Sequence, residues 1–286
     1  MKFDLGSFAT SRVTLGTSSW ALDEPALTQL KAAAVVAAAA TEGVGLIDTA
    51  RVYASADGRA SSEQLVGRTV ARLGSSSAFV VASKGGHFRE GDTYVVDGRP
   101  ETIRRNCHQS LRALGAERIE LYFLHKPDPL VPVADSVGAI AELQHEGKVG
   151  HVGVSNVDRE QLAEAMTVAD VVAVQNHTHL LSPDPLIETC HTAGVLYLAY
   201  APFAGSAEAE RVVRSAAVAL AARIQQCSPQ QLVLALLLGL SPTLLPVVGS
   251  RRPASLRSSV SAGRLSITTT ETSSIVGELH REFGPR

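Results

Sequence analysis

The chain has 286 residues, of which 45% are hydrophobic and 19% are charged, so it can bury a large core without disulfide or metal cross-links. Its formal net charge of −2 at pH 7 gives no overall field that would attract nucleic acid or an anionic membrane. The three cysteines lie far apart and in no metal-ligand spacing, which argues against a disulfide framework and a zinc site. We therefore expect a globular cytoplasmic protein with no metal, no membrane-spanning segment and no nucleic-acid partner.

Short apolar runs rich in β-branched residues alternate with longer amphipathic segments, as strands and helices do in a parallel sheet. In chain order, the predicted strands are residues 12–17, 45–50, 78–84, 119–125, 149–155, 170–176, 195–201 and 244–250. The helices predicted between and after them are residues 28–42, 61–73, 100–115, 133–147, 158–167, 183–193, 228–240 and 253–262. Residues 207–226 add a helix to the seventh crossover, and residues 269–282 form a final helix outside the sheet.

Several of these helices carry start and stop signals. The Ser-Ser-Glu-Gln stretch at 61–64 resembles a capping box, and Pro100 and Pro229 suit a first helical turn. Glycines stand where four of the helices should end, namely Gly74, Gly115, Gly147 and Gly194.

Eight strand–helix units follow one another with no break in composition and no Ser/Gly-rich linker. The first strand is followed by GTSSWALDEP and not by the GxGxxG turn of an open doubly wound sheet. We therefore predict an α/β fold in which residues 1–286 form a single domain, a closed (β/α)8 TIM barrel. The segments KFDLGSF and TSRVTL near the N-terminus are expected to form a hairpin that caps the barrel floor.

Polar residues stand at the carboxyl end of nearly every predicted strand, where such a barrel builds its active site. Asp48 ends the second strand with Tyr53 five residues later, Lys84 ends the third and His125 ends the fourth. Taken singly, each has an ordinary explanation, such as capping a turn or binding a stray carbonyl. A lysine and an aspartate in the same barrel mouth must, however, offset each other's charge. We therefore predict that Asp48 pairs with Lys84 and that the four residues act together.

The chemistry of this set is the protonation of an alkoxide. A tyrosine with its ordinary pKa of about 10 is a poor acid at neutral pH, and an adjacent ammonium lowers that pKa. We expect Lys84 to lower the pKa of Tyr53, Asp48 to keep Lys84 charged, and a neutral His125 to place the substrate oxygen.

Six segments in order resemble the signatures of the aldo-keto reductase superfamily over residues 12–262; they are LIDTARVYASADGRASSEQLVGR, VVASK, ELYFLHKPDP, EGKVGHVGVSN, AVQN and LAYAPF. The resemblance implies that Asp48, Tyr53, Lys84 and His125 form the catalytic tetrad, with Tyr53 as general acid. It implies NADPH-dependent reduction of an aldehyde or ketone to an alcohol, or the reverse oxidation of a sugar or alcohol.

The same resemblance implies the contacts with the cofactor. Ser155, Asn156 and Gln175 would bind the carboxamide, and Tyr200 would stack on the nicotinamide ring. Along the rest of the cofactor the implied contacts are Thr17, Asp48, Phe203, Gly205, Ser206, Gly249, Ser250, Arg251, Arg252, Ser258 and Ser259.

Arg251 and Arg252 precede a helix start, where free N–H groups and two guanidiniums would attract a 2′-phosphate and favour NADP over NAD.

Two features depart from the family pattern. Ser258 and Ser259 replace the Glu-Asn pair of many relatives, and Thr178 and His179 replace an aromatic residue and an asparagine. His177 and His179 have no third ligand nearby in the sequence, so we assign no metal to them.

The loops after the strands should line the substrate pocket. The candidates are Trp20, Tyr53, Phe88, Tyr94, His125 and residues 126–131. The loop at 85–100 fits a sugar, a hydroxyketone or an aromatic aldehyde without choosing among these small-molecule carbonyl substrates. Two other functions stay open: a cofactor-holding subunit with little turnover, and a barrel that uses the anion site after the eighth strand for a phosphorylated substrate.

Overall fold

The computed structural model describes residues 11–22, 26–55, 57–58, 60–74, 78–203 and 207–284, with the backbone alone at 207–209. Most of the predicted N-terminal hairpin lies outside these residues.

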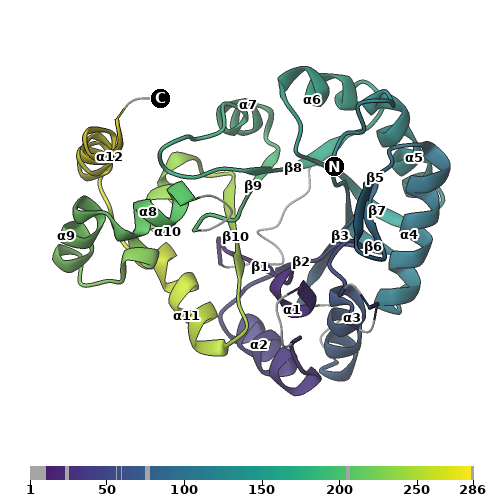
Figure 1. Ribbon diagram of the computed structural model, residues 1–286, viewed down its shortest axis with the longest axis horizontal. Coiled ribbons are helices and arrows are strands. Elements are labelled where there is room, and N and C mark those ends of the chain that lie inside the picture. Colours follow the sequence, from purple (N-terminus) through teal and green to yellow (C-terminus); the bar gives the residue numbers. More distant parts are fainter. Residues whose placement is uncertain are drawn as a thin grey trace.

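Eight parallel strands form a closed barrel (Figure 1). All eight were predicted from the sequence, and the ring closes where the first strand pairs with the last, with Leu15 opposite Val248. The strands are β1 (Thr14–Gly16), β2 (Leu46–Asp48), β3 (Val80–Gly85), β6 (Ile119–Leu124), β7 (Val149–Ser155), β8 (Val171–His177), β9 (Leu196–Tyr200) and β10 (Leu244–Gly249).

A ring of helices surrounds the barrel, close to the predicted positions (Figure 1). These helices are α2 (Gln29–Thr41), α3 (Ser62–Arg72), α4 (Pro100–Leu114), α5 (Val133–His145), α6 (Arg159–Met166), α7 (Leu186–Ala193), α10 (Pro229–Leu240) and α11 (Pro253–Ser261). A short helix that the sequence did not predict, α1 (Ser19–Leu22), follows β1, and a 3-10 turn, η3 (Ala262–Arg264), follows α11.

The predicted helix at 207–226 is two helices, α8 (Ala207–Arg214) and α9 (Ala216–Ile224). The break lies at Ser215, whose backbone is extended and whose hydroxyl accepts a hydrogen bond from the Val218 N–H at 3.1 Å. This hydroxyl satisfies a backbone donor that a continuous helix would have used internally, so Ser215 starts a new helix. The final helix α12 (Thr269–Phe283) packs beside α9, outside the ring (Figure 1).

The predicted helix signals are largely present. Ser61 caps α3 by accepting from the Gln64 N–H, which is one half of the expected capping box. The four glycines expected at helix ends all have positive φ; they are Gly74, Gly115, Gly147 and Gly194.

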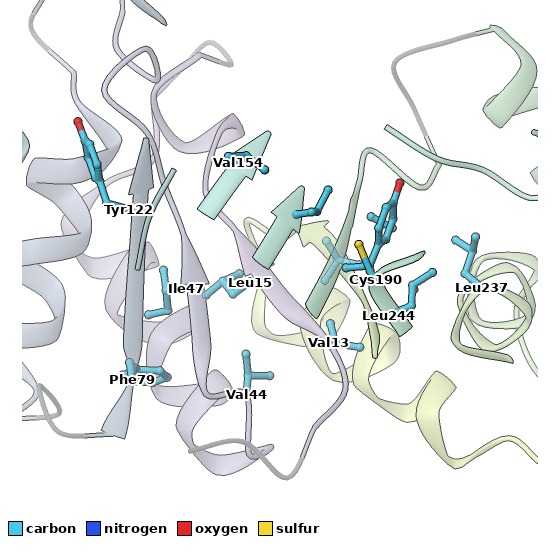
Figure 2. Packing of buried hydrophobic residues seen from close by; sticks show 14 of the residues in the cluster. Val13, Leu15, Val44, Ile47, Phe79, Tyr122, Val154, Cys190, Leu237 and Leu244 are labelled. Carbon is cyan, nitrogen blue, oxygen red and sulfur yellow. The ribbon is translucent and has the colours of Figure 1, made fainter. Parts of the chain in front are cut away.

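Two apolar layers follow from the alternation of side chains along each strand. One layer fills the barrel and includes Leu121 and Phe123 of β6. The other joins the strands to the helices; Figure 2 shows Leu15 and Ile47 on strands of this layer and Leu237 on a helix. Every second side chain of a strand points into the barrel, and the last of these inward positions lies at the barrel mouth. This alternation therefore decides which side chains reach the site.

The predicted loop at 85–100 contains an antiparallel hairpin of β4 (His87–Glu90) and β5 (Thr93–Val96). Its two connecting residues are Gly91, which has a φ of 59°, and Asp92. A Gly-Asp pair between two short strands is a known hairpin signal, so the hairpin could have been predicted from the sequence.

Across the part of the chain that the structure describes, the helices are all too short or too polar to cross a bilayer.

Candidate active site

Asp48 and Lys84 lie at the carboxyl ends of the neighbouring strands β2 and β3, and His125 directly follows the next strand, β6. Lys84 Nζ lies 2.7 Å from Asp48 Oδ2, which confirms the predicted pair, and donates to the Thr49 carbonyl at 2.9 Å. Both side chains are buried, so the carboxylate compensates the ammonium where water cannot.

Tyr53 completes the set from the loop between β2 and α3. Its carbonyl accepts from the Ser62 N–H at 2.9 Å, which ties the loop to the first turn of α3. Its hydroxyl lies 3.4 Å from Lys84 Nζ, and its ring meets the His125 ring edge-on with 5.9 Å between centroids. The four residues predicted from separate parts of the sequence therefore form one cluster.

Burial and charge oppose each other in this cluster. Burial lowers the pKa of Lys84, but the combined effect of Asp48 and Tyr53 raises it by more, so the net pKa lies above its ordinary value. Burial raises the pKa of Tyr53 while Lys84 lowers it, and the net pKa also lies above the ordinary value. Lys84 therefore lowers the pKa of Tyr53, as expected, but desolvation of the phenolate outweighs this effect, so the net pKa does not fall below the ordinary value.

His125 is neutral near pH 7. Burial first, and then the charges of Lys84, His87 and Lys126, hold its pKa well below 6.5. A neutral imidazole can donate one hydrogen bond to a carbonyl oxygen, which agrees with the expected positioning role.

A cavity of about 260 Å³ opens beside these residues and is lined by Tyr53, His87, His125, Lys126, Ser155, Asn156, Gln175 and Tyr200. His87 was not among the residues predicted from the sequence, and its ring centroid is 5.0 Å from that of His125. The next residue, Phe88, was predicted to line the pocket; it is buried and absent from the lining because neighbouring residues of β4 face opposite ways.

Trp20 also lies away from this cavity. Its indole is 1% exposed and its Nε1 donates to the Ser250 carbonyl at 2.8 Å, so it joins α1 to the end of β10. Tyr94 is exposed on β5 and does not line the cavity, but its ring contacts His87, which does, and the Arg89 guanidinium.

Two of the residues expected to bind the carboxamide, Asn156 and Gln175, are hydrogen-bonded to other residues of the site. Asn156 Nδ2 donates to the His125 carbonyl at 2.9 Å, and Asn156 Oδ1 accepts from the Tyr200 hydroxyl at 2.7 Å. Gln175 Nε2 donates to Asp48 Oδ1 at 2.8 Å, so Gln175 supports the carboxylate of the tetrad. Gln175 and Ser155 both line the cavity beside the tetrad.

A second cavity, of about 280 Å³, adjoins the first because Tyr53 and Tyr200 line both. Its other walls are Gly16, Ser18, Asp48, Ala201, Pro202, Phe203, Val247, Val248 and Gly249. Thr17, predicted as a contact, is fully buried behind this wall, where its hydroxyl donates to the Asp48 carbonyl at 2.8 Å.

The segment after β10 leads into α11, as predicted. The Arg251 guanidinium donates to the Ser19 carbonyl, Arg252 is exposed at the N-cap, and Ser250 is buried. Ser258 is exposed on α11, and the Ser259 hydroxyl donates to the Ser255 carbonyl at 3.1 Å. Gly205 and Ser206 lie outside the described residues. Within the described ranges, no group of three or more His, Cys, Asp and Glu side chains is arranged to hold a metal ion.

Comparison with known proteins agrees with this geometry. The aldo/keto reductase family model matches residues 12–277. An uncharacterised oxidoreductase of Schizosaccharomyces pombe is 31% identical over 229 residues, which cover 79% of this chain and 72% of that protein. A probable aldo-keto reductase of Glycine max is 26% identical over 257 residues, covering 80% and 73% of the two chains.

Solved structures share the fold. The aldo/keto reductase of Klebsiella pneumoniae in complex with NADP and acetate has a TM-score of 0.77 at 24% identity, covering 96% of this chain and 92% of that one. A glycerol dehydrogenase of Gluconobacter oxydans has a TM-score of 0.79 at 24% identity, covering 96% and 93%. The family match over nearly the whole chain, together with the tetrad at the barrel mouth, shows that the chain belongs to the aldo/keto reductase family of oxidoreductases.

Proposed function

We propose that this protein reduces an aldehyde or ketone to an alcohol with NADPH, and that Tyr53 is the general acid. The observation that carries the proposal is the hydrogen-bonded series from Asp48 through Lys84 to Tyr53, with Nζ–O distances of 2.7 Å and 3.4 Å. The phenol at the end of this series lines both cavities, so it can meet a substrate and a cofactor at once. The same groups serve the reverse oxidation of an alcohol or sugar.

NADPH, when bound, supplies the hydride. Tyr53 donates its phenolic proton to the oxygen of the carbonyl that is reduced, and Lys84 stabilises the phenolate that remains. Asp48 and the Thr49 carbonyl hold the Lys84 ammonium in place before the reaction, so this stabilisation needs no reorganisation. His125, at the rim of the same cavity, donates a hydrogen bond that orients the substrate oxygen.

The second cavity has the features that a nicotinamide requires. Tyr200 offers a ring at its wall, and Gly249 has no side chain that would occupy the cavity. Ser155 and Gln175 stand beside Tyr200 with polar atoms for the carboxamide. The reductase of Klebsiella pneumoniae, which has the same fold, was crystallised with NADPH.

The role of Tyr53 is tested by Tyr53→Phe, which removes the proton donor and keeps the ring. We expect the rate of carbonyl reduction to fall by roughly 10²–10⁴-fold, while NADPH binding, followed by fluorescence titration, stays close to that of the wild type. Retained turnover would show that another group donates the proton.

The choice of cofactor is tested by Arg252→Ala, because this exposed guanidinium lies at the N-cap of α11. Loss of a charge-assisted contact with a 2′-phosphate should weaken NADPH binding by about tenfold and leave NADH binding nearly unchanged. Arg251→Ala should show the same preference. Equal weakening of both cofactors would contradict a 2′-phosphate site at these arginines.

We also infer that the protein acts in the cytoplasm. Cys107, Cys190 and Cys227 are free thiols, and such thiols persist in a reducing compartment.

A further inference from the structure

A third cavity, of about 420 Å³, lies outside the tetrad, between α3, α4 and the turn of the β4–β5 hairpin. It shares no lining residue with the two cavities of the candidate active site. Its lining is Arg51, Ala54, Ser55, Gly58, Ser61, Gln64, Arg89, Gly91, Gln109, Arg112 and Ala113. Three arginines and several neutral hydrogen-bond donors therefore surround it, and among the described residues its lining contains neither an aspartate nor a glutamate. The nearby Asp57 carboxylate accepts a hydrogen bond from the Ser55 hydroxyl at 2.6 Å.

The three arginines are only partly neutralised by the described parts of the chain. Arg51 Nε donates to a neutral partner, Gln109 Oε1, at 3.2 Å. Arg112 has no ion pair with any described residue. Arg89 is 3.5 Å from Asp92 Oδ1, but the Asp92 side chain is 93% exposed, so water screens that pair. The fold therefore brings three like charges around one cavity, whose described lining supplies no carboxylate.

Two of these guanidiniums are held in place before any ligand arrives. The Arg89 side chain is 18% exposed, its Nε donates to the Gly91 carbonyl at 2.8 Å, and its guanidinium lies 5.0 Å from the centroid of the Tyr94 ring. Arg51 is fixed by its bond to Gln109 and by its own N–H, which donates to the Lys84 carbonyl at 3.3 Å. A preorganised set of donors loses little side-chain entropy when it binds an anion.

We propose that this cavity binds the phosphate group of a small molecule. Guanidiniums from three different elements, the amides of Gln64 and Gln109 and the hydroxyl of Ser61 suit a divalent, tetrahedral anion with several acceptor oxygens. The site is separate from the segment proposed to bind the cofactor phosphate, which precedes α11; α2 lies between α3 and α11 (Figure 1). The ligand is inorganic phosphate or a phosphate monoester, and these two sources share the same recognition chemistry.

The test is calorimetric titration of the full-length protein with inorganic phosphate and, separately, with glycerol 3-phosphate, each with and without saturating NADPH. We expect one saturable site that persists when NADPH is bound. Tighter binding of glycerol 3-phosphate would identify an ester as the ligand, and equal or weaker binding would identify free phosphate.

Three variants locate the site. Arg112→Gln, at an exposed helical position where glutamine is well tolerated, should weaken binding several-fold, and the double variant Arg51→Gln/Arg112→Gln should weaken it by about tenfold or more. Arg72→Gln, a matched loss of an exposed arginine at the end of α3, should leave the affinity unchanged.

Three results would overturn the proposal: no saturable binding, equal weakening by Arg72→Gln, or loss of the site in Arg252→Gln. The last result would place the phosphate beside α11. Because the titration without NADPH does not need the cofactor to bind, it separates failure of this site from failure of the proposed reductase function.

Discussion

At the scale of single residues, His125 links the chemistry to stability. Its pKa lies well below 6.5 in the folded protein, chiefly through burial, whereas an unfolded chain has a histidine pKa near 6.5. Below pH 6.5 the unfolded state therefore takes up a proton that the folded state refuses. This contribution to stability is complete above pH 6.5 and is lost as the pH falls toward the folded pKa.

We expect the free energy of unfolding to decrease below pH 6.5 with a contribution from His125 of up to about 1.4 kcal/mol per pH unit. His125→Asn should remove that contribution, as measured by urea unfolding between pH 7 and pH 5. His87, whose pKa is also lowered by burial, should still contribute in this variant. His145→Asn, at an exposed position of α5, is the control. An unchanged pH slope in His125→Asn would mean that His125 takes up its proton as readily in the folded protein as in the unfolded chain.

At the scale of elements, the approach of α3 to α4 depends on Gly67. A Cβ at this position would lie 2.1 Å from the Leu114 carbonyl oxygen and 2.6 Å from its carbon, and backbone cannot move aside as a flexible side chain can. Gly67→Ala should therefore lower the free energy of unfolding by about 1–3 kcal/mol, despite the better helix propensity of alanine. Gly138→Ala on α5 has nothing within 4 Å of the added Cβ and should instead stabilise the protein by about 0.5–1 kcal/mol.

Chemical denaturation of both glycine variants measures the difference. If the two substitutions had effects of the same sign, the contact between α3 and α4 would be looser than the structure has it. The comparison matters for function because α3 starts directly after the loop that carries Tyr53.

At the scale of the whole molecule, Arg12 links the segment before the first barrel strand, β1, to the start of the last strand, β10. Its Nη2 donates to the carbonyls of Leu238, Ser241 and Leu244, at 3.1, 2.6 and 3.1 Å, which lie at the end of α10 and the start of β10. A cation at the carboxyl end of a helix also interacts well with the helix dipole.

Arg12→Met should lower the free energy of unfolding by about 1.5–3 kcal/mol, because the helix carbonyls lose a charged donor. Arg72→Met, at an exposed position on α3, should change it by less than about 0.5 kcal/mol. Equal midpoints of denaturation for the two variants would mean that Arg12 contributes no more than an ordinary surface arginine.

The sequence by itself determined the barrel and the residues at its mouth. Alternating apolar strands and amphipathic helices are local patterns, and in parallel strands all carboxyl ends meet at one side, so Asp48, Lys84 and His125 could be placed together from the sequence. The pairing of Asp48 with Lys84 was predicted from the cost of burying an unpaired charge, and the 2.7 Å distance between Lys84 Nζ and Asp48 Oδ2 confirms it.

Only the tertiary structure decided which side chains face the cavities and how the charges balance. Gln175 supports Asp48 across 127 residues of sequence, and His87 rather than Phe88 faces the site because of the register of a hairpin. The pKa of Tyr53 lies above its ordinary value because desolvation depends on everything packed around the phenol. The facing of side chains and the balance of charges depend on contacts between residues that are distant in the chain. A local sequence pattern therefore cannot predict them.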